Sequence, residues 1–94
     1  MAELIAKGTA ELASSDFTLV DGQSTTLNLK PANSTLLGLA SDQQASVQIK
    51  TADNGYVNVG VLTHTCPAQV LSGPGTFRVV RHACVSGATG VDRT

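Results

Sequence analysis

Two histidines and two cysteines are the residues of this chain whose types and spacing are best suited to chemistry. They form two matching pairs, His64-x-Cys66 and His82-x-Cys84, and the 94-residue sequence holds no other histidine or cysteine. Residues two apart on a β-strand point to the same face of the sheet. Each pair would therefore present an imidazole and a thiol side by side if it lay on a strand.

Three roles are open for His64, Cys66, His82 and Cys84. Two adjacent pairs would offer two nitrogen and two sulfur ligands, a set that tetrahedral Zn²⁺ accepts. A disulfide between the two cysteines would close a loop of about 18 residues and stabilise the fold by roughly 3 kcal/mol. In the third role the cysteines are small buried apolar residues and the histidines are partly exposed. The sequence favours this third role, because structural zinc sites prefer Cys-x₂-Cys turns and cytoplasmic synthesis disfavours disulfides.

No other part of the sequence carries a recognisable catalytic or cofactor motif. The seven acidic residues are scattered, and the GxSxG, HExxH, P-loop and GxGxxG patterns are absent. Gly73-x-Gly75 is too short to cradle a phosphate, and the stretch Ser72-Gly73-Pro74-Gly75 is typical of a hairpin-like β-turn. We therefore expect a protein that is not an enzyme, with no catalytic, cofactor-binding or metal site, no cofactor and no small-molecule substrate.

The length and composition predict one domain, residues 1–94, with a thin core. Phe17, Tyr56 and Phe77 are the only aromatic residues, so Leu, Val, Ile and Ala must supply most of the buried area. A core of this kind predicts a marginal monomer that gains stability by self-association or by docking on a larger body.

The charge and hydropathy of the chain argue against a nucleic-acid or membrane partner. The net charge is −1, which does not suit a protein that neutralises phosphates. Residues 1–53 carry −3, whereas residues 54–94 carry +2 from Arg78, Arg81, Arg93 and one acid, and this asymmetry suits head-to-tail contacts between copies. The apolar runs are too short to span a bilayer, and the first residues lack a basic signal-peptide region. We expect a protein that is made and kept in a cytoplasm unless it leaves by another route, such as cell lysis.

The pattern of apolar residues predicts β-strands throughout. Residues 17–20 form a short strand, Asp21-Gly22 is a tight turn, and residues 25–30 alternate until Pro31 ends the strand. The strongest signal is Asp53-Asn54-Gly55 between the alternating runs 47–50 and 56–61, which predicts a hairpin.

The remaining segments give weaker signals. Residues 4–12 read as a first strand, with a helix as the alternative, and residues 33–44 are the least regular part. Residues 76–81 form a strand with Phe77, Val79 and Arg81 on one face. Residues 87–94 contain a short final strand anchored by Val91, which we expect to pair with a sheet edge, either in its own sheet or in a neighbouring copy. About seven to eight short antiparallel strands with regular turns predict an all-β fold, a single small β-sandwich or barrel.

Two stretches resemble the C-terminal ending of small virion proteins of tailed bacteriophages. They are Gly-Pro-Gly-Thr-Phe-Arg-Val at residues 73–79 and Gly-Val-Asp-Arg at residues 90–93. In the proteins that this ending resembles, a Gly-Pro-Gly-Thr-aromatic-Arg-Val strand precedes a short closing strand. The runs at residues 15–30 and 45–60 look like the earlier strands of the same module. The two His-x-Cys pairs are not part of the resemblance.

The resemblance implies a structural function. It implies a virion protein that decorates or cements a bacteriophage capsid by binding the major capsid protein, as a homotrimer on the capsid surface after assembly in the host cytoplasm. A tail or fibre accessory module is the alternative within virions. A receptor- or carbohydrate-binding β-sandwich module is the alternative from another class, although three aromatics are few for stacking sugar rings.

Overall fold

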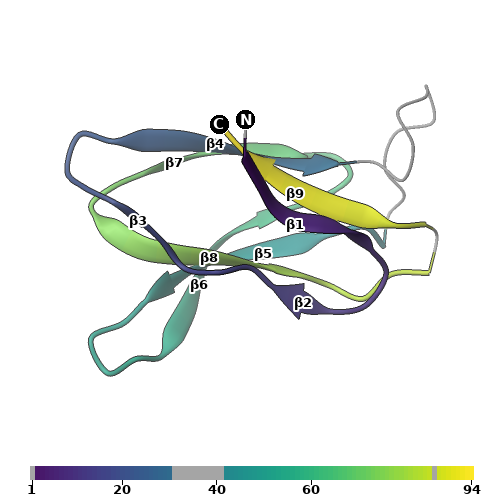
Figure 1. Cartoon of the computed structure of the whole chain (residues 1–94), viewed down its shortest axis with the longest axis horizontal. Coiled ribbons are helices and arrows are strands. Elements are labelled where there is room, and N and C mark those ends of the chain that lie inside the picture. Colours follow the sequence, from purple (N-terminus) through teal and green to yellow (C-terminus); the bar gives the residue numbers. More distant parts are fainter. Residues whose placement is uncertain (1, 31–41, 86) are drawn as a thin grey trace.

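The chain is built from β-strands in every segment that the computed structural model describes, which comprises residues 2–30, 42–85 and 87–94 (Figure 1). These segments contain nine strands and no helix. The strands are β1 (Ala2–Gly8), β2 (Leu12–Ala13), β3 (Phe17–Leu19), β4 (Ser24–Lys30), β5 (Ala45–Lys50), β6 (Tyr56–Leu62), β7 (Ala68–Ser72), β8 (Gly75–Arg81) and β9 (Thr89–Arg93).

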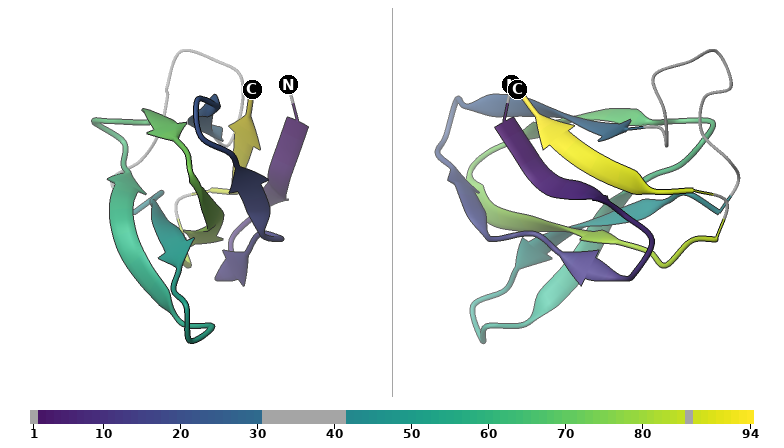
Figure 2. Two further views of the ribbon diagram at one scale, coloured as in Figure 1. Left: turned by 90° about the vertical axis from the view of Figure 1, so that its left-hand side faces the viewer. Right: turned by 45° about the vertical axis from the view of Figure 1, so that its right-hand side comes forward.

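The strands form two antiparallel sheets that pack into a β-sandwich. Sheet A has the order β1-β9-β4-β7, and sheet B has the order β2-β8-β5-β6, with β3 also paired to β8. Figure 2 separates the two layers, with β6 on one side of the molecule and β1 and β9 on the other. The all-β class and the sandwich architecture predicted from the sequence are confirmed, with nine described strands where seven to eight were expected.

Alternation along the strands decides which side chains enter the core between the sheets. In β4 the buried side chains are Thr25, Leu27 and Leu29, and in β8 they include Phe77 and Val79, each two residues apart. Both sheets contribute to one apolar cluster. Its members are Ile5, Leu19, Leu27, Leu29, Ala45, Val47, Leu62, Leu71, Phe77, Val79 and Val91.

The predicted hairpin at residues 54–55 is confirmed. Strands β5 and β6 pair antiparallel from Lys50 opposite Tyr56 outward, with one bulge next to Val47. Asn54 takes a positive φ of 66°, which Asn tolerates better than most residues with a β-carbon. The turn is closed by the Thr51 amide, which donates to the Gly55 carbonyl oxygen at 2.8 Å.

The turn at Ser72-Gly73-Pro74-Gly75 differs from the prediction, because it does not join two paired strands. Strand β7 pairs with β4 in sheet A, whereas β8 pairs with β2, β3 and β5 in sheet B. The turn therefore carries the chain from one sheet to the other. A β-carbon at Gly73 would collide with the backbone of Leu19 and Val20, so glycine is required at this close approach. Turn residues mark a reversal, and the sheet to which the next strand belongs is decided by tertiary pairing.

The segment at residues 4–12 is neither one strand nor a helix. Strand β1 ends at Gly8, and Leu12 belongs to β2 in the opposite sheet. Gly8 marks the break, because a β-carbon there would lie 2.8 Å from a guanidinium nitrogen of Arg81. The chain therefore changes sheets where a buried arginine passes.

The predicted final strand is present as β9, but it does not lie at an edge. It pairs with β1 on one side and with β4 on the other, and Val91 is buried in the core. The C-terminal half of the chain thus inserts between strands of the N-terminal half, in sheet A through β9 and in sheet B through β8. Consequently strands of the acidic and basic halves are interleaved in both sheets, and neither half forms a sheet of its own.

Two expectations fall on residues that are not described. Pro31 as the end of β4 and most of the irregular stretch 33–44 lie outside the described segments. Of the described part of that stretch, Gln43 is buried and donates from Nε2 to the Gly87 carbonyl oxygen at 3.1 Å.

Candidate binding surface

The two His-x-Cys pairs occupy different environments. His64 and Cys66 are exposed in the connection between β6 and β7. His82 and Cys84 follow β8, where His82 is half-buried and Cys84 is buried with its thiol 3.1 Å from the Gly87 carbonyl oxygen. Both cysteines are free thiols. Within the described segments, no group of three or more His, Cys, Asp or Glu side chains is placed to hold a metal ion.

The favoured role, with buried cysteines and partly exposed histidines, therefore holds for three of these four residues. Cys84 behaves as a small buried residue, as expected, and both histidines are at least partly exposed. Cys66 contradicts the expectation, because it is exposed rather than buried. The reason is that its pair lies in a loop, where the two-residue periodicity of a strand does not apply.

His82 makes one side-chain hydrogen bond, with Ser46 on β5. The Ser46 hydroxyl and His82 Nε2 lie 2.7 Å apart, and the His82 amide donates to the Gln44 carbonyl oxygen at 2.9 Å. A serine–histidine pair acts as nucleophile and base when a third group orients the imidazole and donors stabilise an oxyanion. No hydrogen bond from a described residue to His82 Nδ1 is present. The pair serves here as a side-chain link between β5 and the end of β8.

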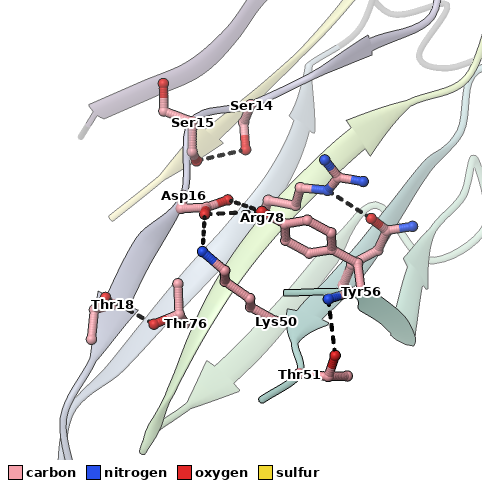
Figure 3. Close-up of polar contacts among 11 residues, drawn as sticks. Ser14, Ser15, Asp16, Thr18, Lys50, Thr51, Tyr56, Thr76 and Arg78 are labelled. Atoms are coloured by element: carbon pink, nitrogen blue, oxygen red, sulfur yellow. Dashed lines mark hydrogen bonds and ion pairs between the residues drawn. The ribbon is translucent and has the colours of Figure 1, made fainter. Parts of the chain in front are cut away.

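A polar network covers the outer face of sheet B, and we call it the Arg78 surface (Figure 3). It consists of Asp16, Gln48, Lys50, Tyr56 and Arg78. Strand alternation places them there, because Phe77 and Val79 on either side of Arg78 point into the core. Three strands and the residue before β3 thus bring together positions that are far apart in sequence.

Arg78 is held over an aromatic ring. Its guanidinium carbon lies 3.6 Å from the centre of the Tyr56 ring, within the range of a cation–π contact. Arg78 Nε donates to Gln48 Oε1 at 2.8 Å, and Gln48 Nε2 donates in turn to Asn58 Oδ1 at 2.9 Å. The arginine is therefore ordered before any partner arrives.

Asp16 is occupied by its own neighbours. The Tyr56 hydroxyl lies 2.9 Å from both carboxylate oxygens of Asp16, and Lys50 Nζ lies 3.7 Å from one of them. No described acidic side chain forms an ion pair with Arg78. The terminal guanidinium nitrogens of Arg78 make no hydrogen bond to a described residue. This surface therefore presents an ordered cation that is suited to a carboxylate on a partner.

Arg81, which the sequence grouped with Arg78 as a surface charge, is only 4% exposed. Its side chain points into the molecule, on the same face of β8 as Phe77 and Val79. The expectation that Arg81 makes contacts between copies is therefore wrong, because the side chain is buried. The alternation in residues 76–81 places Arg81 on the core face of the strand. Arginine is seldom fully buried, however, so its charge alone predicts a position at the surface.

The pairing of Asp16 with Tyr56 was not foreseen from the sequence. The two residues are 40 positions apart, and no local pattern connects them. The available signal was the hairpin that places Tyr56 at the start of β6, but the position of Asp16 depends on β3 pairing with β8.

Comparisons with known proteins give no relative for this chain: no protein-family model, no curated protein and no solved structure matches it. The described residues form no helix that is long and apolar enough to cross a membrane.

Proposed function

We propose that this chain is a structural virion protein of a tailed bacteriophage, which decorates or cements the capsid by binding the major capsid protein. The resemblance of residues 73–79 and 90–93 to phage virion proteins supports this function. Those residues form the crossing into β8, part of β8 itself and most of β9. Strands β8 and β9 are interior strands, one in each sheet. The resembling residues thus belong to the centre of the sandwich.

The Arg78 surface is the observation that carries the proposal of a protein partner. Arginine and tyrosine are the residue types most enriched at interface positions that contribute strongly to binding. Here the two are stacked and fixed by Gln48, so little side-chain freedom is lost when a partner docks. The terminal guanidinium nitrogens would donate hydrogen bonds to a carboxylate of the capsid protein.

A carbohydrate-binding role has less support from the same residues. Stacking of a sugar requires a free aromatic face, and one face of Tyr56 is covered by Arg78. Phe77 is buried, and Phe17 packs against Phe77 and lies under Arg93. We therefore develop the capsid function alone.

The proposal is tested by adding the purified protein to capsids assembled from the major capsid protein of the same genome. Wild-type protein should co-sediment with the capsids to a saturating ratio. Arg78→Ala should weaken binding about tenfold or more, the scale of a strongly contributing interface residue. Lys7→Ala is the matched control, because it removes the same charge from an exposed position on β1 in the other sheet.

Two results would distinguish failure of the proposed function from failure of the proposed binding surface. Absence of wild-type binding to these capsids would overturn the decoration function. Equal binding by the wild type and by Arg78→Ala would leave a capsid protein that docks by another surface.

A further inference from the structure

The Asn54-Gly55 turn combines two features that favour a reaction on its own side chain. The sequence has four asparagines, at positions 28, 33, 54 and 58, and Asn54 is the one that precedes glycine. A glycine has no β-carbon to shield its amide nitrogen, so Gly55 offers the least hindered nitrogen next to an asparagine of this chain. Asn54 is also exposed, and the turn between β5 and β6 projects away from the rest of the sandwich (Figure 1).

Hydrogen bonds of Thr51 hold this turn closed. The Asn54 amide donates to the Thr51 carbonyl oxygen at 3.1 Å, and the Thr51 amide donates to the Gly55 carbonyl oxygen at 2.8 Å. The Gly55 amide itself donates to the Thr51 hydroxyl oxygen at 3.1 Å. The hydroxyl donates in turn to Asp53 Oδ1. The proton of the Gly55 amide is therefore held by a side chain that lies four residues earlier.

The closed turn protects Asn54 from its neighbour. An amide nitrogen attacks a side-chain carbonyl carbon only after it has lost its proton, and here that proton is bonded to Thr51. The Asp53 carboxylate lies beside the same residue, because a β-carbon at Gly55 would be 3.5 Å from Asp53 Oδ1. A negative charge so close disfavours removal of the amide proton. The turn must therefore open before the side chain reacts, and such local openings are far more frequent than global unfolding.

We propose that Asn54 is a self-modification site, at which the Gly55 nitrogen displaces the side-chain nitrogen of Asn54, and that the Thr51 hydroxyl sets the rate by holding the attacking nitrogen. Hydroxide removes the Gly55 amide proton, and the nitrogen attacks Asn54 Cγ with formation of a C–N bond. The side-chain nitrogen takes a proton from water and leaves as ammonia, which completes a succinimide ring. Water then opens the ring at either carbonyl and yields aspartate or isoaspartate in place of Asn54. The net change consumes water and releases ammonia.

The two products affect the hairpin differently. Both add a negative charge next to Asp53. Isoaspartate also routes the main chain through the former side chain, which lengthens it by a methylene group at the turn that sets Lys50 opposite Tyr56. Tyr56 binds Asp16 and lies under Arg78, so the isoaspartate product disturbs a support of the Arg78 surface. The reaction itself is independent of capsid binding.

Timed peptide mapping of the wild-type protein tests the site. The purified chain is held at mildly alkaline pH, and aspartate and isoaspartate at each asparagine are measured by mass spectrometry. Asn54 should convert about tenfold faster or more than Asn58, the matched control, which is exposed on the adjoining strand but precedes the β-branched Val59. Equal conversion at the two positions, or no conversion at Asn54, would overturn the proposal.

Substitution of Thr51 tests the role of the hydroxyl. Thr51→Val keeps the shape of the side chain and should speed the native conversion of Asn54 about fivefold, the effect of one ordinary hydrogen bond on an opening equilibrium. Thr51→Ser keeps the hydroxyl and should react at the wild-type rate. In urea, where the turn is open in every variant, the three rates should be faster and equal. Circular dichroism confirms that each variant is folded before the native measurement. Equal native rates for Thr51→Val and the wild type would overturn the control by Thr51.

Discussion

Arg81 Nη1 donates a hydrogen bond to the carbonyl oxygen of Ala6 at 2.6 Å, and this contact ties β8 in sheet B to β1 in sheet A. The same nitrogen lies 3.1 Å from the Thr89 carbonyl oxygen on β9, and Nε donates to the Ala10 carbonyl oxygen at 2.8 Å. Among the described residues no acidic side chain pairs with this guanidinium. A buried cation is thus satisfied by backbone carbonyls alone, and it links three segments.

Replacing Arg81 should destabilise the fold severely. Arg81→Met keeps much of the apolar volume but leaves three carbonyl oxygens without their donors, and each unsatisfied buried group costs about 1–3 kcal/mol. We expect a loss of roughly 3–5 kcal/mol in the free energy of unfolding, measured by urea denaturation. Arg78→Met is the control, since it changes a half-buried arginine on the outer face of the same strand whose side chain donates to Gln48 rather than to backbone carbonyls, and it should cost only about 1 kcal/mol. Similar losses of stability for both variants would contradict the role of the Arg81 hydrogen bonds in holding the two sheets together.

Strand β9 should be essential to the fold rather than a detachable tail. Val91→Ala removes two methyl groups from a side chain with no exposed area and should cost about 2–3 kcal/mol. Removing residues 88–94 takes out an interior strand of sheet A, so we expect no cooperative unfolding transition in thermal circular dichroism. A truncated protein with a sharp transition would show that β1 and β4 can close the sheet without β9.

The two cysteines should differ in reactivity. Cys66 is exposed, whereas Cys84 is 7% exposed and its thiol contacts the Gly87 carbonyl oxygen. Under native conditions iodoacetamide should modify one thiol per chain, and in urea it should modify two. Peptide mass spectrometry should place the native modification on Cys66, and Cys66→Ser should abolish it. Rapid native labelling of both thiols would contradict the burial of Cys84.

The hairpin turn should weaken in acid. The hydrogen bond from the Thr51 hydroxyl, followed by the backbone amides of Asp53 and Gly55, lowers the pKa of Asp53 below its usual value. A carboxyl with a lowered folded-state pKa contributes stability above its unfolded pKa, near 4, and loses that contribution as pH falls through the folded value. Nuclear magnetic resonance titration of Asp53 should show this lowered pKa, and Thr51→Val should bring it back toward the ordinary value. An unchanged pKa in Thr51→Val would show that the hydroxyl is not the cause.

Local features of the fold were predictable from the sequence, and non-local ones were not. The 54–55 hairpin and the alternation in β4 and β8 follow from turn residues and two-residue periodicity, which involve neighbours in the chain. Which sheet receives the strand after Gly73, and which strands flank β9, depends on pairings between distant segments. No short window of sequence contains those pairings.

The candidate binding surface was predictable only in part. Arg78 was expected on the face of its strand opposite Phe77, and it lies there, whereas its stacking on Tyr56 depends on the order β8-β5-β6. The position of β6 at the end of sheet B, in the order of the described strands, also follows from non-local pairing rather than from composition.

Among the strands that the structure describes, β1 pairs with β9 alone, and this pairing has a consequence for biosynthesis. All the strands of sheet B precede residues 89–93 in the chain, so the strand pairing of sheet B does not depend on β9. Strand β1 is translated first, yet its single described partner is the strand translated latest. It must therefore wait unpaired through the translation of almost the whole sequence. Long-range pairings of this kind slow folding and expose a nascent chain to aggregation. Sheet A thus closes only after β9 has been translated, and a chaperone that shields β1 during this interval would raise the yield of folded protein.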